Sequence, residues 1–407
     1  MKLDELGFVG RGKSKHRPRN DPSLYGGEYP FVQTGDVKEA DLWLSHYTQT
    51  YNEAGLAQSK LWPAGTLCIT IAANIAETAI LKIPACFPDS IVAFIPDEGK
   101  ADARFVKYYI DTIKLRMQNA SKGTTQDNLS VDKLLSFDFD LPDYPSQERI
   151  ASVLCTYDDL IENNNRRVKI LEEMAQMIYR EWFVNFRFPG YKIIKLVKTQ
   201  HGSNPEHWRI KPLRELTTLI SRGISPAYDE NAPCIVINQK CIRNSRLSLD
   251  ESRRQSKVVP SEKLVKLGDI LINSTGVGTL GRVAQVLEPM PNCTVDSHVS
   301  IVRPKSNMEF LGKALLHIEE HFAQLGVGST GQTELGRERI ANTLMTVPPE
   351  KLQEQFGKII EPINRMLVCC FRQNANLKRT RDLLLPKLIS GEVSVEHPEP
   401  EAASQIS

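Results

Sequence analysis

The feature that most constrains the fold is an internal duplication, at an offset of 203 to 208 residues in a chain of 407. Four segments of the first half recur in the same order in the second half. The pairs are YPFVQTGDV with APCIVINQK, PAGTLCIT with KLGDILIN, PDSIVAFIP with VDSHVSIVRP, and SKGTTQ with STGQT. Solenoid repeats are only about 20 to 50 residues long. The longer period predicts two copies of one module of strands and helices, each followed by a long helix.

Both long helices are predicted from an apolar seam whose spacing alternates between four and three residues, which is typical of a coiled coil. Polar residues within such a seam, such as Asn164, usually fix the register of the helix pair. The first seam contains Ile150, Leu154, Tyr157, Ile161, Asn164, Val168, Leu171, Ala175, Ile178 and Trp182. The second contains Phe356, Ile360, Ile363, Leu367, Cys370, Asn374, Leu377, Arg381, Leu384 and Leu388.

Two helices of matched length in one chain predict antiparallel pairing, as a spacer between two globular modules. At about 1.5 Å per residue, residues 146–184 would span about 58 Å. The alternative is that each helix packs only on its own module. Pro362 is expected to kink the second helix or to mark where its regular part begins, and Pro386 is expected to end or bend it. The predicted fold class is therefore α+β, with two similar mixed α/β modules separated by two long helices that pair as an antiparallel coiled coil.

The N-terminal stretch GFVGRGKSKHRPRN matches the pattern of a phosphate-binding P-loop. Such a loop needs a buried strand before it and a helix that starts at its Lys-Ser pair. Few residues precede Gly7, and Pro18 and Pro22 oppose a helix. We interpret the stretch instead as a flexible basic arm that faces DNA, because Lys and Arg displace counterions from phosphates. Its candidate contacts are Arg11, Lys13, Lys15, Arg17 and Arg19.

Further candidate DNA contacts follow a predicted strand at matching positions of the two modules. Amide and basic side chains can pair with base edges in the major groove, although for any single residue an ordinary polar loop at a strand end is the stronger interpretation. The net charge of +2 means that a nucleic-acid surface must be a local patch. The candidates at the matching positions are Gln33, Thr34 and Asp36 in the first module and Asn238, Gln239 and Lys240 in the second. A separate basic cluster of the second module adds Arg243, Arg246, Arg253 and Arg254.

Several short patterns match enzyme motifs, but the residues around them do not fit the corresponding sites. Pro88-Asp89 with Glu98 and Lys100 resembles a nuclease motif, but the strand-like IVAFI between them separates the acids by roughly 20 Å. The glycines of G-x-G-x-x-G from Gly276 to Gly281 are expected to form a hairpin rather than a dinucleotide site. The histidines and the eight cysteines show no spacing typical of metal ligands. The cysteines are expected to be reduced thiols. We expect a cytoplasmic protein without catalytic or metal-binding residues.

Membrane insertion is not expected either. The most apolar stretch, residues 67–87, carries Asn74, Glu77 and Lys82, which a bilayer would penalise, and two buried strands fit it better. No apolar run follows the first residues, so no signal peptide is expected. The paired loops GTTQ and TGQT (residues 123–126 and 330–333) could contact DNA or cap the segment that follows each of them.

The duplicated layout resembles the specificity subunit of type I restriction–modification systems. The likeness covers about residues 1–395 and is carried by SQERIASVLCTYDDLIENNNRRVKILEEMAQMIYREWF, by NLKRTRDLLLPKLISGEV and by the opening basic stretch with YPFVQTGDV. It implies target-recognition domains at residues 1–145 and 201–348. It also implies a central helix and linker at 146–200, a second long helix at 349–395 and a disordered tail at 396–407.

The resemblance implies a subunit that recognises a bipartite, asymmetric double-stranded DNA sequence and performs no chemistry itself. Its partners would be two methylation subunits, which use S-adenosylmethionine, and two restriction subunits, which use ATP and magnesium. The seam helices would space the domains and dock the methylation subunits. The alternative is a non-catalytic coiled-coil scaffold that binds only protein, which explains the helices but not the paired basic modules.

Overall fold

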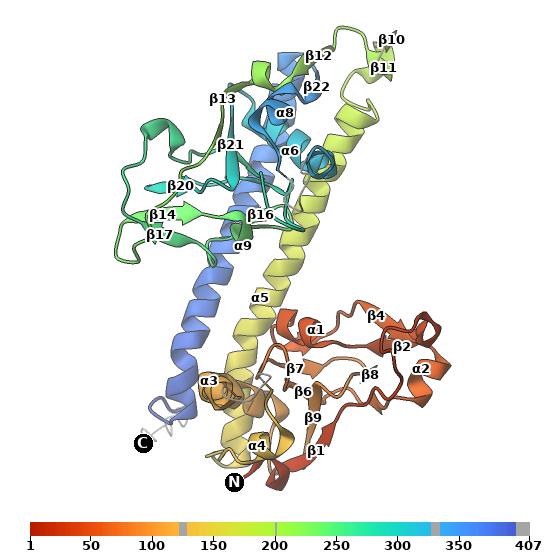
Figure 1. Cartoon of the computed structure of the whole chain (residues 1–407), viewed down its shortest axis with the longest axis vertical. Helices are drawn as coiled ribbons and strands as arrows, with labels where there is room; N and C mark the ends of the chain where they lie inside the picture. The colour runs from red at the N-terminus through yellow and green to blue at the C-terminus, as the bar shows by residue number, and fades with distance from the viewer. Residues whose placement is uncertain (122–127, 200–201, 327–333, 396–407) are drawn as a thin grey trace, which may run out of the picture. The chain divides into compact units, whose positions relative to one another are not determined.

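A computed structural model describes residues 1–121, 128–199, 202–326 and 334–395 of the chain (Figure 1). The loops GTTQ and TGQT and the predicted disordered tail lie outside these residues. The chain divides into two compact units, one formed by Met1–Asn164 with Gln373–Ser407 and the other by Asn165–Arg372. Each unit therefore contains one module, part of the first long helix and part of the second. The domain boundaries proposed from the sequence stay a prediction.

The module of unit 1 contains two sheets. A five-stranded sheet has the order β1-β9-β6-β7-β3, and a four-stranded sheet has the order β4-β2-β8-β5. The strands are β1 (Gly7–Arg11), β2 (Tyr25–Phe31), β3 (Trp43–Leu44), β4 (Gln49–Tyr51), β5 (Leu61–Trp62), β6 (Leu67–Thr70), β7 (Thr78–Leu81), β8 (Ala85–Cys86) and β9 (Ile91–Pro96). The shorter helices are α1 (Thr34–Glu39), α2 (Glu53–Ala57), α3 (Ala103–Ser121) and α4 (Val131–Leu135).

The module of unit 2 repeats this topology. Its four-stranded sheet has the order β13-β21-β18-β19, and β14 pairs antiparallel with β17 and parallel with β20, as β2 pairs with β4 and β8. The strands are β13 (Thr217–Arg222), β14 (Cys234–Ile237), β15 (Ile242–Arg243), β16 (Arg246–Leu247), β17 (Arg253–Gln255), β18 (Ile270–Asn273), β19 (Val283–Gln285), β20 (Cys293–Val295) and β21 (Val299–Pro304). The helices are α6 (Met308–His317), α7 (Glu319–Gln324) and α8 (Arg337–Asn342). The duplication is thus present in the fold.

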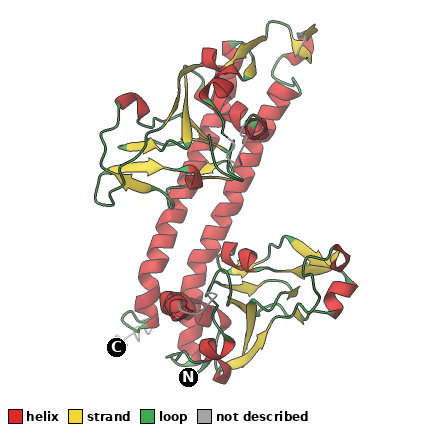
Figure 2. Cartoon of the chain, in the orientation of Figure 1, coloured by secondary structure: helices red, strands yellow, loops and turns green. Residues whose placement is uncertain are grey.

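Two further strand pairs complete unit 2. β10 (Leu196–Thr199) pairs with β11 (Gly202–Pro205), and β12 (Arg209–Pro212) pairs with β22 (Leu344–Val347), all antiparallel. Figure 2 shows the strands of each module gathered beside the long helices. The α+β fold class is confirmed. No helix among the described residues is long and apolar enough to cross a membrane.

The long helices are α5 (Tyr144–Tyr179), which continues as one π-helical turn over Arg180–Val184, and α9 (Glu350–Ile389). Within unit 1 they pair antiparallel, since Asn164 Nδ2 donates to Asn374 Oδ1 at 3.0 Å and Arg381 forms an ion pair with Asp158. Within unit 2 the rings of Trp182 and Phe356 lie 5.8 Å apart. The alternative in which each helix packs only on its own module is therefore wrong.

The observed seam differs from the predicted one at a few positions. Asp158 is buried where the spacing predicted Tyr157, and Tyr179 is buried where it predicted Ile178. A straight α-helix has about 3.6 residues per turn, so its buried stripe drifts away from a strict 3.5-residue repeat. The other predicted positions from Ile150 to Ala175 are buried, as are Phe356, Ile360, Ile363 and Leu367. Trp182, Leu377 and Leu384 are half-buried.

The prolines of α9 do not interrupt it. Helical structure runs through Pro362 and continues past Pro386 to Ile389. Both prolines are exposed, so the carbonyl that each one leaves without its helical partner can be hydrated. Of the two outcomes predicted for Pro386, an end of the helix at that residue is wrong, because the helix ends about one turn later.

Candidate nucleic-acid interface

The first part of the N-terminal basic stretch is a strand, which corrects the interpretation of a flexible arm for residues 7–13. Gly7–Arg11 forms the edge strand β1, paired antiparallel with β9, and Gly12 and Lys13 continue the pairing through bonds to the carbonyl oxygens of Ile91 and Phe87. A Cβ at Gly12 would meet the Pro88 carbonyl oxygen at 2.2 Å, so glycine is required by close backbone contact and not by a phosphate. The described residues 15–21 form no helix after Ser14. The stretch therefore does not have the helix that a P-loop requires after its Lys-Ser pair.

Three of the five basic residues in this stretch make contacts within the protein. Arg11 Nε donates to the Asp89 carbonyl oxygen at 2.6 Å, and Arg19 pairs with the Asp89 carboxylate at 2.6 and 2.9 Å. Arg17 donates to the carbonyl oxygens of Ser14 and His16. The side chains of Lys13 and Lys15 are exposed and have no ion pair within the described residues. These two lysines are therefore the best candidates for phosphate contacts in the stretch.

The contacts of Asp89 also argue against a nuclease site formed by Asp89, Glu98 and Lys100. Asp89 is held by two arginines, and strand β9 separates it from Glu98. Among the described residues no group of three His, Cys, Asp or Glu side chains could hold a metal ion. The glycines from Gly276 to Gly281 lie between the antiparallel strands β18 and β19, as the predicted hairpin requires.

The polar residues at matching positions act as helix caps. In unit 1 the Asp36 carboxylate accepts the backbone N–H of Gln33 at 2.7 Å, and Gln33 Nε2 donates to Gln49 Oε1. In unit 2 Asn238 accepts the backbone N–H of Lys240 at 2.8 Å and donates to the Glu251 carbonyl oxygen. Burial raises the pKa of Asp36. These side chains position the turn after each strand and are less free to contact bases than the sequence suggested.

The remaining members of this predicted set differ in exposure. Thr34 and Gln239 are half-buried, and Gln239 Oε1 is buried without a hydrogen-bond partner among the described residues. Lys240 is exposed, so of the second module's trio it is the side chain that can best reach a nucleic acid.

The arginines of the second module differ in what they contact. Arg243 is exposed, and Arg254 donates to the Ala232 carbonyl oxygen at 3.0 Å. Arg253 lies 3.5 Å from the centre of the exposed Tyr228 ring. Arg246 forms two bonds of 2.6 Å with Glu172 on α5, so it binds the helix within unit 2 and is withdrawn from the candidate DNA surface.

Sequence reasoning missed two places where an exposed aromatic ring meets a cation. One is Tyr228 with Arg253. The other is Phe8 on β1, which is 52% exposed, with Lys60, whose ammonium lies 5.0 Å from the Phe8 ring centre and 3.7 Å from that of the buried Trp62. Aromatic faces and cations are typical of nucleic-acid surfaces. Neither pair has a contiguous sequence signal, because its two members lie far apart in the chain and the fold brings them together.

Comparison with known proteins agrees with this arrangement. The family described as type I restriction modification DNA specificity domain matches residues 1–173. Over most of its length the chain is similar in sequence to type I restriction enzyme specificity subunits. The MjaIX specificity subunit of Methanocaldococcus jannaschii is 24% identical over 97% of this chain and 93% of its own length. The HindI specificity subunit of Haemophilus influenzae is 21% identical over 68% of this chain and 74% of its own.

A solved structure supports the fold of the whole chain. The S subunit of a type I restriction–modification system from M. genitalium aligns with a TM-score of 0.59, with 15% sequence identity, over 96% of this chain and 95% of that one. The family match covers the first module, and the second module repeats its topology. The resemblance inferred from the duplicated segments is thereby confirmed.

Proposed function

We propose that this chain is the DNA-recognition subunit of a type I restriction–modification system, with each module reading one half of a bipartite target. The observation that carries the proposal is the repeated topology: two modules of one fold, each packed against parts of the same two helices. Counted from the capping residues Gln33 and Asn238, the exposed Gly35 corresponds to the exposed Lys240, so the two modules present different groups at this position. Because the two modules differ, each would recognise a different half-site, and the complete target would be asymmetric.

The proposal includes two methylation subunits and two restriction subunits as partners. Exposed apolar side chains on the long helices support docking of the methylation subunits, because isolated surface helices normally present polar residues there. In unit 1 they are Val153, Leu160 and Leu383. In unit 2 they are Ile170, Met174, Met177, Ile359 and Met366. In this scheme the chain itself holds no cofactor, while S-adenosylmethionine, ATP and magnesium are bound by the partners.

The test is a genome-wide map of methylated adenine in cells that carry this chain with its methylation partner. We expect a gapped, asymmetric motif that disappears when the chain is deleted and returns on complementation. Exchanging residues 201–348 for those of a related subunit should change one half of the motif only. If methylation in an active system is unchanged by deletion, the coiled-coil scaffold becomes the better explanation.

The basic stretch of unit 1 gives a second prediction. Replacing Lys13 and Lys15 with Gln should weaken binding of the assembled methyltransferase to all DNA sequences. It should also reduce the slope of log K against log salt concentration by about 0.9 for each phosphate that is no longer neutralised. Fluorescence anisotropy at several salt concentrations measures both effects. Lys351→Gln with Lys358→Gln, two exposed lysines of α9, is the matched control and should leave the slope unchanged. Equal slopes for both pairs would place Lys13 and Lys15 off the DNA.

A further inference from the structure

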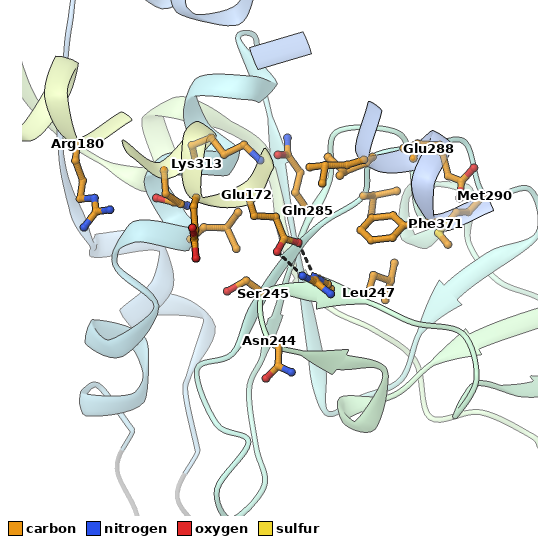
Figure 3. A pocket seen from close by; sticks show the side chains of 18 residues that line it. Glu172, Arg180, Asn244, Ser245, Leu247, Gln285, Glu288, Met290, Lys313 and Phe371 are labelled. Atoms are coloured by element: carbon orange, nitrogen blue, oxygen red, sulfur yellow. Dashed lines mark hydrogen bonds and ion pairs between the residues drawn. The ribbon is translucent and has the colours of Figure 1, made fainter. Parts of the chain in front are cut away.

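Unit 2 contains a cavity of about 280 Å³ between its module and its parts of the long helices (Figure 3). Its walls come from α5, the β15–β16 hairpin, the end of β19, α6 and α9. Leu247, Met290, Leu316, Leu367 and Phe371 supply the apolar part of the lining. Apolar walls with a few polar groups are typical of small-molecule sites, and the volume is at the small end of their range.

One polar residue of this lining is a buried lysine. Lys313, on α6, is 4% exposed and has no hydrogen bond or ion pair within the described residues. Figure 3 shows its side chain reaching toward the labelled Glu172 and Gln285. Gln285 donates from Nε2 to the Met308 carbonyl oxygen, and its Oε1 has no partner among the described residues. A lysine is almost never buried without a partner, so its position requires an explanation.

The acids around the cavity are already neutralised by other cations. Glu172 is held by Arg246 through two bonds of 2.6 Å, and Glu288 is held by Arg372 at 2.7 and 2.9 Å. Glu173 faces Lys169 at 4.0 Å. Of the described lining residues, Lys313 and the exposed Arg180 are the cations outside these pairs. Glu309, one turn before Lys313 on α6, also acts on its charge, but no ion pair joins the two within the described residues. The cavity therefore presents a buried ammonium without an ion pair beside apolar walls.

The protonation state of Lys313 fits this description. Burial lowers its pKa to about 8, against the opposing effect of Glu172 and Glu309. At neutral pH most molecules still carry the ammonium. A carboxylate that enters the cavity would gain a charge-assisted hydrogen bond from an ammonium whose own side chain is almost fully buried.

We propose that this cavity binds a small organic acid, with its carboxylate against the ammonium of Lys313 and an apolar or aromatic body along Leu247, Met290 and Phe371. The ligand joins the module to both long helices of unit 2, because all of these elements line the cavity. It would therefore stabilise their association. This proposal is independent of DNA recognition, and either one can fail without the other.

The experiment is isothermal titration of the full chain with 3-phenylpropionate, using 3-phenylpropanamide as the uncharged ligand of the same shape. We expect saturable binding of the acid and at least tenfold weaker binding of the amide, which is the effect of about one charged hydrogen bond. Lys313→Met should reduce the affinity for the acid at least tenfold and leave the amide unchanged. Lys351→Met, on the exposed start of α9, should change neither.

A chemical readout provides a second, independent measurement. Limited acetylation of the chain followed by peptide mass spectrometry gives the modification rate of Lys313, and 3-phenylpropionate should lower that rate at least fivefold without protecting Lys351. Thermal melting establishes that Lys313→Met is folded before its affinity is compared. Equal affinities for acid and amide, no saturation at about 10 mM acid, or an unprotected Lys313 would each overturn the proposal.

Discussion

Replacing Arg381 with Met is expected to destabilise unit 1 by about 3–5 kcal/mol, because it leaves a buried carboxylate without its counter-charge. The Asp158 side chain is only 2% exposed. It accepts hydrogen bonds from Arg381 of α9 and from the hydroxyl of Tyr108 of α3. Burial, together with the charge of Asp158, raises the pKa of Tyr108, so the hydroxyl keeps its proton and remains a donor. The tyrosine alone cannot neutralise the carboxylate.

Urea unfolding of the full chain, followed by circular dichroism, measures the effect. The control is Arg379→Met, an exposed arginine two residues earlier in α9, which should stay within about 0.5 kcal/mol of the wild type. Adding Asp158→Asn to Arg381→Met removes the stranded charge and should recover a large part of the stability. If the single and double variants unfold at the same urea concentration, the buried charge does not explain the cost.

The long helices were predictable because their signal is local. A spacing of four and three residues, repeated over many turns, is visible without any knowledge of the partner. The buried face was not predictable at every position. The drift of the helix places Asp158 in the seam instead of Tyr157. The carboxylate is tolerated there because an arginine 223 residues away neutralises it and the hydroxyl of Tyr108 on α3 donates to it. Neither contact can be predicted from the residues next to Asp158 in the sequence.

The candidate DNA residues were less predictable than the fold, for a similar reason. Gln33 and Asn238 each follow a strand, where a helix cap and a base-reading side chain have the same sequence signature. The composition of the basic stretch indicates a flexible arm, whereas the partner strand that orders it, β9, lies far along the chain. Arg246 resembles the other surface arginines in sequence, and only the fold places it against Glu172. Exposure and pairing are properties of the assembled sheets and helices.

Replacing Lys313 with Met is expected to stabilise unit 2 by about 3 kcal/mol at pH 7, since each unit of pKa difference corresponds to about 1.4 kcal/mol between folded and unfolded states. The pKa of Lys313 is lowered from 10.5 to about 8 in the folded chain. Below pH 8 both states are protonated, and the folded state carries the full cost of the buried ammonium. The cost disappears as pH rises from about 8 to about 10.5, where the unfolded lysine also loses its proton.

The difference in unfolding free energy between Lys313→Met and the wild type should therefore be largest at pH 7 and close to zero above about pH 10.5. Urea titrations at neutral pH, at about pH 9 and at about pH 10.5 measure it, and taking the difference cancels other groups that titrate in this range. Lys351→Met should show no such dependence, because Lys351 is exposed. A constant difference would mean that the ammonium is solvated in the folded state. Saturating 3-phenylpropionate should reduce the difference in unfolding free energy between Lys313→Met and the wild type at neutral pH. Its carboxylate supplies to the wild type a counter-charge that the variant does not need.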